Sequence, residues 1–115
     1  MRMVTPKPPK ETLIDSFSYH PYSGIDDYGK SIFGNEIKIS NVRIDRTPKY
    51  TFSSSGRELM YNAVIFCYEG LTHPMPEFET RSKVVFDEVE HIITGIFPNK
   101  EPYSSQMYSV EIEVV

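Results

Sequence analysis

The sequence predicts an all-β protein, a small antiparallel β-barrel of about six strands with an extended N-terminal arm and two long loops. Short segments alternate between apolar and polar residues, and turns rich in Gly and Pro separate them. No segment has the periodicity of a confident helix. With 115 residues, 39% of them hydrophobic, we expect one domain with a single core over residues 11–115, after an arm over residues 1–10.

The first ten residues, MRMVTPKPPK, predict an extended arm, because they hold three prolines and no apolar periodicity. They also carry three positive charges and no acidic residue. A solvated tail is one reading. The other is an arm that becomes ordered only on an acidic partner protein, and four residues are candidates for that contact: Arg2, Lys7, Pro8 and Lys10.

Two strands and a turn are expected in the next part of the chain. TLIDSFSYHPY places Leu13, Phe17 and Tyr19 on one face and predicts a strand that ends at Pro21. SGIDDYGKSIFGN, with three glycines among Asp and Asn, is typical of turns. NEIKISNVRIDRT is a strand whose apolar phase shifts by one residue, which predicts a β-bulge at Ser40-Asn41.

Residues 46–60, RTPKYTFSSSGRELM, form the first long loop, and connections of this length tend to be functional or disordered. SGRE matches a capping box for one helical turn, but a hairpin tip is the favoured reading. The segment from Arg43 to Arg57 is basic, with Asp45 as its single acid. We expect the loop to contact a partner through five residues: Arg46, Lys49, Tyr50, Phe52 and Arg57.

The remaining strands lie in the second half of the chain. YNAVIFCYE predicts the most apolar strand, with both faces covered. GLTHPMPEFETR is the second long loop and adds the candidate contact residues His73, Pro74 and Met75. SKVVFDEVEHIITGIF predicts a tight hairpin that turns at Asp87-Glu88. PNKEPYSS predicts a loop, and the strict alternation of YSVEIEVV predicts a closing strand with a neighbour on each side.

We find no pattern of residues that predicts catalysis, a metal site or a cofactor. The three histidines have no metal-ligand spacing, the acid pairs lie in predicted turns, and no Gly-rich phosphate loop follows a strand. Cys67 lies in an apolar run and is expected to be buried, and a single cysteine fits a reducing compartment or an intracellular assembly. No apolar run approaches 18 residues, so no transmembrane helix is expected.

Five segments of the chain resemble, in order, the minor capsid protein family of tailed phages and prophages of Gram-positive bacteria. They are PKPPKETLI, ISNVRIDRT, YNAVIFCY, FETRSKVVFDEVEHIITGIFP and EPYSSQMYSVEIEVV. By analogy with head-closure (stopper) proteins, the resemblance implies a non-enzymatic subunit of the phage neck. Such a subunit would be made in the bacterial cytoplasm and form a homo-oligomeric ring between portal or adaptor proteins and a tail-terminator or tail-completion protein.

Two further readings concern nucleic acid. An OB-like module that binds single strands would stack bases on Tyr50, Phe52, Tyr61 and Tyr68. Alternatively, the basic 46–60 loop of a neck ring could contact DNA in the channel. The net charge of −4 disfavours capture of nucleic acid by the whole surface, so a specific contact between this loop and an acidic neighbouring protein is the preferred expectation.

Overall fold

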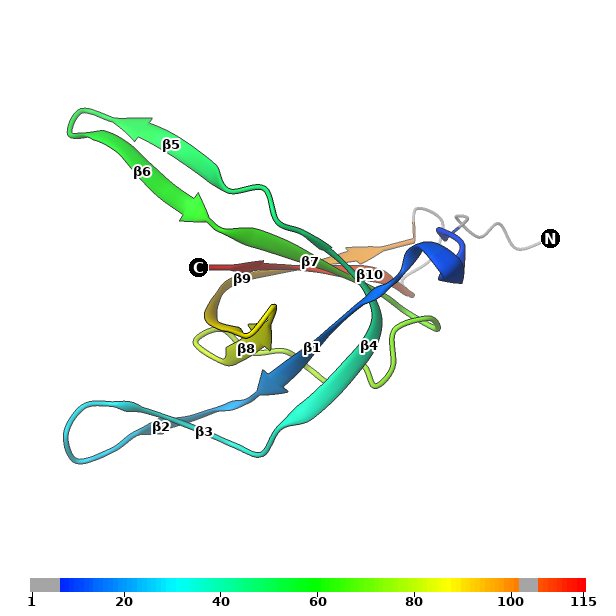
Figure 1. Cartoon of the computed structure of the whole chain (residues 1–115), viewed down its shortest axis with the longest axis horizontal. Coiled ribbons are helices and arrows are strands. Elements are labelled where there is room, and N and C mark those ends of the chain that lie inside the picture. The colour runs from blue at the N-terminus through cyan, green and yellow to red at the C-terminus, as the bar shows by residue number, and fades with distance from the viewer. Residues whose placement is uncertain (1–6, 102–105) are drawn as a thin grey trace.

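Six strands close into an antiparallel barrel, which confirms the predicted fold class. The computed structural model describes residues 7–101 and 106–115. Around the barrel the strands follow the order β1 (Asp15–His20), β4 (Ile37–Asp45), β7 (Ala63–Tyr68), β10 (Met107–Val114), β9 (Val89–Lys100) and β8 (Lys83–Phe86) (Figure 1). Pairing of β8 with β1 closes the barrel.

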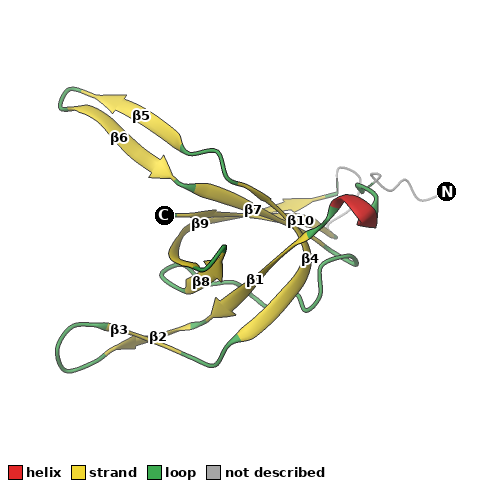
Figure 2. Ribbon diagram, in the orientation of Figure 1, coloured by secondary structure: helices red, strands yellow, loops and turns green. Residues whose placement is uncertain are grey.

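Outside the strands, the described chain contains one short 3-10 helix, η1 (Lys10–Thr12), which leads into β1. Figure 2 shows strands joined by loops over nearly all the rest. No helix in the described part of the chain is long and apolar enough to cross a membrane.

The barrel interior is filled by one residue in two from each strand. Ile39, Ile65 and Ile112 have no exposed surface, and each belongs to a different strand. Strand β7 is the most deeply placed, although Phe66 and Tyr68 on its outer face are only half-buried, so the prediction that both faces are covered holds for its first half. Cys67 is buried, as predicted, and burial raises the pKa of its thiol to about 12.

Strand β10 pairs along its length with two neighbours, which confirms the expectation for YSVEIEVV. It lies antiparallel to β7, with Ile112 opposite Ile65, and antiparallel to β9, with Ile112 opposite Ile96. The backbone of Val115 continues the ladder through two hydrogen bonds with Ile92, of 3.0 and 3.1 Å. The last residues are ordered because the barrel cannot close without them.

The predicted bulge in β4 is present and is centred on Asn41. Asp15 pairs with Val42 and Ser16 pairs with Ser40, so Asn41 is the extra residue, and its φ of 62° places it in the left-handed region. Its side-chain amide donates to the carbonyl of Leu71 at 3.2 Å. Asn is one of the few residue types that adopt this conformation readily, because its side chain bonds locally.

The β8–β9 hairpin turns at Asp87 and Glu88, as predicted, and both residues have positive φ, at 53° and 62°. The prediction that a loop begins at Pro98 is wrong, because β9 runs on to Lys100. Pro98 is tolerated since β9 has β10 as its single strand partner there, and β8 reaches no further than Ile92. Residues 102–105 of the predicted loop lie outside the described residues.

Two hairpins project from the barrel on the same side (Figure 1). Their four strands were not predicted, although a hairpin tip was the favoured reading within residues 46–60. β2 (Tyr22–Ile25) and β3 (Ser31–Phe33) continue the β1–β4 pair, in the segment read as a turn. β5 (Lys49–Ser53) and β6 (Gly56–Tyr61) continue the β4–β7 pair. The radius of gyration is therefore 15.7 Å, against about 13 Å for a compact chain of this length.

Candidate protein interface

The β5–β6 hairpin has one apolar face and one polar face, although neither face packs on its own barrel. Tyr50 lies opposite Leu59, and Phe52 lies opposite Arg57. Because side chains alternate along a strand, these four residues share a face. The other face carries Thr51, Ser53 and Glu58, and the hydroxyl of Ser53 bonds to Ser55 and donates to the carboxylate of Glu58. A hairpin exposed to water on both faces has no internal reason for this segregation.

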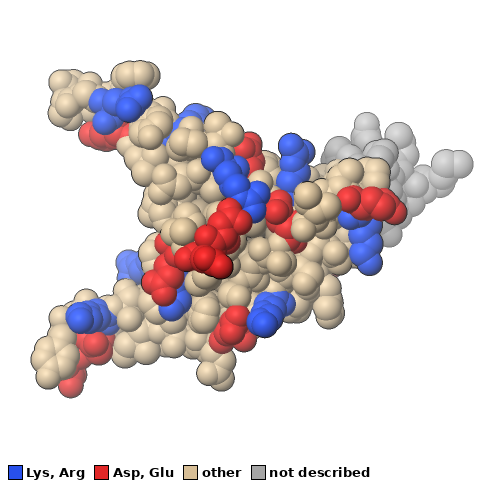
Figure 3. Space-filling view, viewed as in Figure 1, with Lys and Arg blue, Asp and Glu red and all other residues tan. Residues whose placement is uncertain are grey.

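The apolar face of the hairpin combines exposed aromatic rings with a positive charge. Phe52 is 83% exposed and Tyr50 is 41% exposed. The guanidinium of Arg57 lies 4.2 Å from the centre of the Tyr50 ring, which holds the charge beside the apolar surface. Aromatic residues and arginine are enriched among interface hot spots, so this face has the composition of a protein contact. On the side seen in Figure 3, the tip of the hairpin is uncharged, and basic and acidic atoms lie next to one another behind it.

Arg46 lies at the root of the hairpin, apart from the other four contact residues predicted for the 46–60 loop. Its guanidinium donates to Asp87 at 2.5 Å and to Asp15 at 3.1 Å, and it lies 5.8 Å from the Phe86 ring centre. These hydrogen bonds lower the pKa of Asp87 and raise the pKa of Arg46. Arg46 therefore ties the root of β5 to β1 and to the β8–β9 turn, and Lys49 is the exposed cation that follows it in β5.

Replacing Arg46 with alanine should lower stability modestly at neutral pH, and this deficit should shrink as the pH falls below 3.8, the ordinary pKa of Asp87. The folded-state pKa of Asp87 is depressed below its ordinary value of 3.8. A depressed carboxyl pKa contributes stability above the unfolded pKa, and that contribution is lost as the pH falls through the folded pKa. Urea unfolding at pH 7 and pH 3 measures the effect.

Arg43→Ala is the matched control, because Arg43 lies three residues earlier, on β4, and forms no ion pair within the described residues. Its effect should be smaller at both pH values. If the Arg46→Ala deficit were equally large at pH 3, packing on Phe86 would account for it, and the ion pairs would not.

The candidates of the N-terminal arm fall partly outside the structure, since Arg2 lies outside the described residues. Lys7 donates from Nζ to the carbonyl of Glu69 at 2.6 Å and lies 5.8 Å from the centre of the Tyr108 ring. Pro8 is half-buried, and Lys10 is exposed at the start of η1. The arm thus reaches the barrel at the end of β7 that is farther from the β5–β6 hairpin.

The second long loop, residues 70–81, is fixed to the barrel at several points. His73 forms two backbone hydrogen bonds with Ser40, and Pro74 follows it through a cis peptide bond. Phe78 packs edge-on against Tyr19 at 5.0 Å between ring centres, and the hydroxyl of Tyr19 accepts from the backbone N–H of Glu79. Of the three residues predicted for this loop, Met75 alone lines a cavity, and His73 is exposed.

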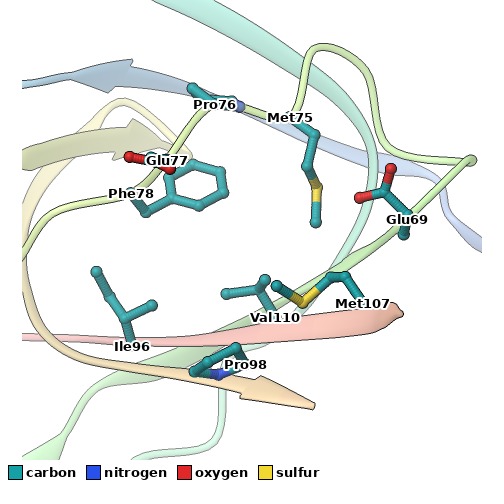
Figure 4. A pocket seen from close by; sticks show the side chains of 9 residues that line it. All are labelled: Glu69, Met75, Pro76, Glu77, Phe78, Ile96, Pro98, Met107 and Val110. Atoms are coloured by element: carbon teal, nitrogen blue, oxygen red, sulfur yellow. The ribbon is translucent and has the colours of Figure 1, made fainter. Parts of the chain in front are cut away.

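That cavity is an apolar groove of 380 Å³ between the loop and the two adjacent strands β9 and β10 (Figure 4). The side chains from the three elements point toward one another across it. The apolar lining is formed by Met75, Pro76, Phe78, Ile96, Pro98, Met107 and Val110. Sequence reasoning missed all of these except Met75, because they come together through the barrel topology rather than through a motif.

The β2–β3 hairpin is a further exposed feature that was missed. It displays Ile25, Ile32 and, at its tip, Tyr28, which is 90% exposed. The unexplained apolar residues in SGIDDYGKSIFGN were the available signal. Across residues 7–101 and 106–115, no three His, Cys, Asp or Glu side chains gather in a way that could hold a metal ion.

Comparison with known proteins supplies relatives of the whole domain. The model of a family described as minor capsid protein matches residues 9–114. An uncharacterized protein, ORF5, of Lactococcus phage LL-H is 23% identical over 93 residues, which cover 78% of this chain and 79% of that protein. No solved structure gives a significant match to the chain.

Proposed function

This chain belongs to the minor capsid protein family of phages, and from that premise we propose that it is a head–tail connector subunit of the phage neck. In this role it completes the head by forming a homo-oligomeric ring. Portal or adaptor proteins bind the ring on the head side, and a tail-terminator or tail-completion protein binds it on the other. Its task is structural: to hold neighbouring layers together around the path of the DNA.

The observation that carries the proposal is the segregated face of the β5–β6 hairpin. Phe52 is 83% exposed, and the hairpin that carries it does not pack this side chain against its own barrel. Isolated two-stranded hairpins are marginally stable in water. A hairpin with an aromatic, cationic face is stabilised when that face is covered, and the packing of subunits in a ring would supply the cover.

A protein contact suits this surface better than single-stranded nucleic acid, the alternative reading. The four aromatic residues that would stack bases do not share a face. Tyr50 and Phe52 lie on one face of the hairpin, while Tyr61 pairs with Lys49 at its base. Tyr68 lies at the far end of β7, half-buried against Tyr108 at 6.0 Å between ring centres. A stacking platform requires successive rings along one groove.

Deletion of the gene from the phage genome tests the function. We expect DNA-filled heads that lack tails or lose their genome, with normal free tails and a loss of infectivity that a plasmid copy restores. Electron microscopy of the lysate and plaque counts give the result. Infectious tailed particles from the deletion phage would contradict the proposal, and a salt-sensitive shift of single-stranded DNA by the purified protein would favour the nucleic-acid alternative.

A further inference from the structure

The apolar groove and the β5–β6 hairpin lie at opposite ends of the barrel. Strand β7 begins where β6 ends and runs six residues, or about 20 Å, before Glu69 at the rim of the groove. Figure 1 shows the hairpin projecting on one side and the start of the loop after β7 on the other. Two complementary surfaces at opposite ends would join copies head to tail rather than by a two-fold contact.

The groove offers an apolar cavity with carboxylates beside it. Glu69 and Glu77 contribute to its lining. A second hollow adjoins it, since Glu69 and Met107 line both. This hollow also includes Glu101 and Lys7, whose Nζ donates to the carbonyl of Glu69. Glu101 is 6% exposed, and its Oε2 atom has no hydrogen-bond partner among residues 7–101 and 106–115. A buried carboxylate oxygen left unpaired is costly, so a cation from outside would be bound favourably here.

The hairpin carries an aromatic ring that suits the apolar groove and, beside it, a positive charge that suits the carboxylates. Phe52 and Arg57 are cross-strand neighbours near its tip, so one apolar ring and one guanidinium project together. Within the described residues Arg57 forms no ion pair, and its recorded partner is the face of the Tyr50 ring. An exposed ring beside a positive charge complements an apolar groove whose lining and adjoining hollow hold three glutamates and one lysine, and so carry a net negative charge.

We propose that the β5–β6 hairpin of one copy occupies the groove of the next copy. Phe52 enters between the loop residues Met75 and Phe78 and the β10 residue Met107, and Arg57 pairs with the carboxylates of Glu69 and Glu101. The contact is heterologous, because it uses two different surfaces, and such contacts generate closed rings when the rotation between copies closes. The proposal rests on the neck function and identifies the surfaces that build the ring.

A mixing experiment with the full-length protein tests the head-to-tail arrangement. Phe52→Glu removes the inserting ring, and Met107→Glu places a charge in the groove at a residue that is already 36% exposed. In sedimentation velocity, wild type should form species larger than dimers as its concentration rises. Each variant alone should remain monomeric. An equimolar mixture should form heterodimers and nothing larger, because one intact hairpin then meets one intact groove.

Two matched controls should assemble as wild type does. Thr51→Glu places the same charge on the polar face of the same hairpin, and Ile14→Glu changes a residue that is 84% exposed and belongs to neither surface. A wild-type protein that stays monomeric, variants that assemble normally, or a mixture without heterodimers would each overturn the proposal. A loss of melting temperature in Met107→Glu that vanishes when residues 1–6 are deleted would assign the groove to the chain's own N-terminal segment, which also overturns it.

Crosslinking checks the residue pairing directly. The Ser54→Cys variant, in the turn of the hairpin, and the Glu77→Cys variant, at the groove, leave Phe52, Arg57 and Met107 in place. Mixed and treated with a short bis-maleimide, they should give covalent heterodimers, while a chain with both cysteines should give a ladder. Cys67 is fully buried, so its thiol stays silent in the folded protein. The gene deletion separates the two proposals. If the deletion phage makes tailless heads but the cysteine variants do not crosslink, the neck function stands and the ring uses a different interface. If the variants crosslink but the deletion phage is infectious, the ring exists and the neck function is wrong.

Discussion

Removing residues 108–115 is expected to abolish cooperative unfolding of this protein. The deletion takes away three buried aliphatic side chains, Val110, Ile112 and Val114. At roughly 1.5–3 kcal/mol each, their loss is comparable to the whole stability of a domain, about 5–15 kcal/mol. It also opens the barrel between β7 and β9, which leaves two unpaired strand edges that favour aggregation. Calorimetry and size-exclusion chromatography would report both effects.

A single substitution in β10 tests the same contribution to stability if the truncated chain is insoluble. Ile112→Ala should lower the free energy of unfolding by about 2–5 kcal/mol, as for other buried aliphatic residues. Glu111→Ala, on the same strand with its side chain on the outer face, should change it by less than about 0.5 kcal/mol. A truncated protein that melts cooperatively near the wild-type temperature would show that β10 is dispensable.

The second large effect is expected on phage assembly rather than on folding. Replacing Tyr50, Phe52 and Arg57 together with alanine should leave the melting temperature near that of wild type, because none of the three belongs to the core. Infectivity should fall by more than about 100-fold. Interface hot spots are worth about 2 kcal/mol or more each, and about 1.4 kcal/mol is tenfold in affinity. Arg46 is left unchanged because it braces the fold.

The opposite face of the same hairpin supplies the control. That face also has three exposed residues to replace, Thr51, Ser53 and Glu58. Their triple alanine variant leaves the apolar face unchanged. We expect plaque counts within a few-fold of wild type. Equal losses from the two triple variants would mean that the hairpin matters through its shape or stability, and the segregated face would then have no special role.

The six barrel strands could be predicted because each one buries every second residue within this chain. Alternation in TLIDSFSYHPY and YSVEIEVV reflects the contacts of Phe17, Tyr19 and Ile112 with the core. The shift of phase at Ser40-Asn41 predicted the bulge for the same reason, since a bulge is what restores the inward face. Patterns of this kind record the environment of a residue inside its own subunit.

The projecting hairpins and the groove could not be predicted in the same way. Ile25, Tyr28 and Phe52 have no buried environment within the subunit, so their segments were read from the turn chemistry of Gly, Asp and Ser. The groove depends on long-range packing of the 70–81 loop against β9 and β10, and no local pattern encodes that packing. Candidate contact residues in the 46–60 segment were therefore chosen by their charge and aromatic content. Arg46 was included on this basis, although it forms ion pairs with Asp15 and Asp87 of its own barrel.

The single extra residue at Asn41 has a consequence for the geometry of an assembly. One hairpin leads into β4 and the other follows it, so both are mounted on the two ends of this nine-residue strand. A bulge bends the strand that contains it. The bulge at Asn41 therefore contributes to the angle between the two projections. In the ring proposed above, a chain without the extra residue would present the same surfaces along different directions, and the ring would have a different diameter.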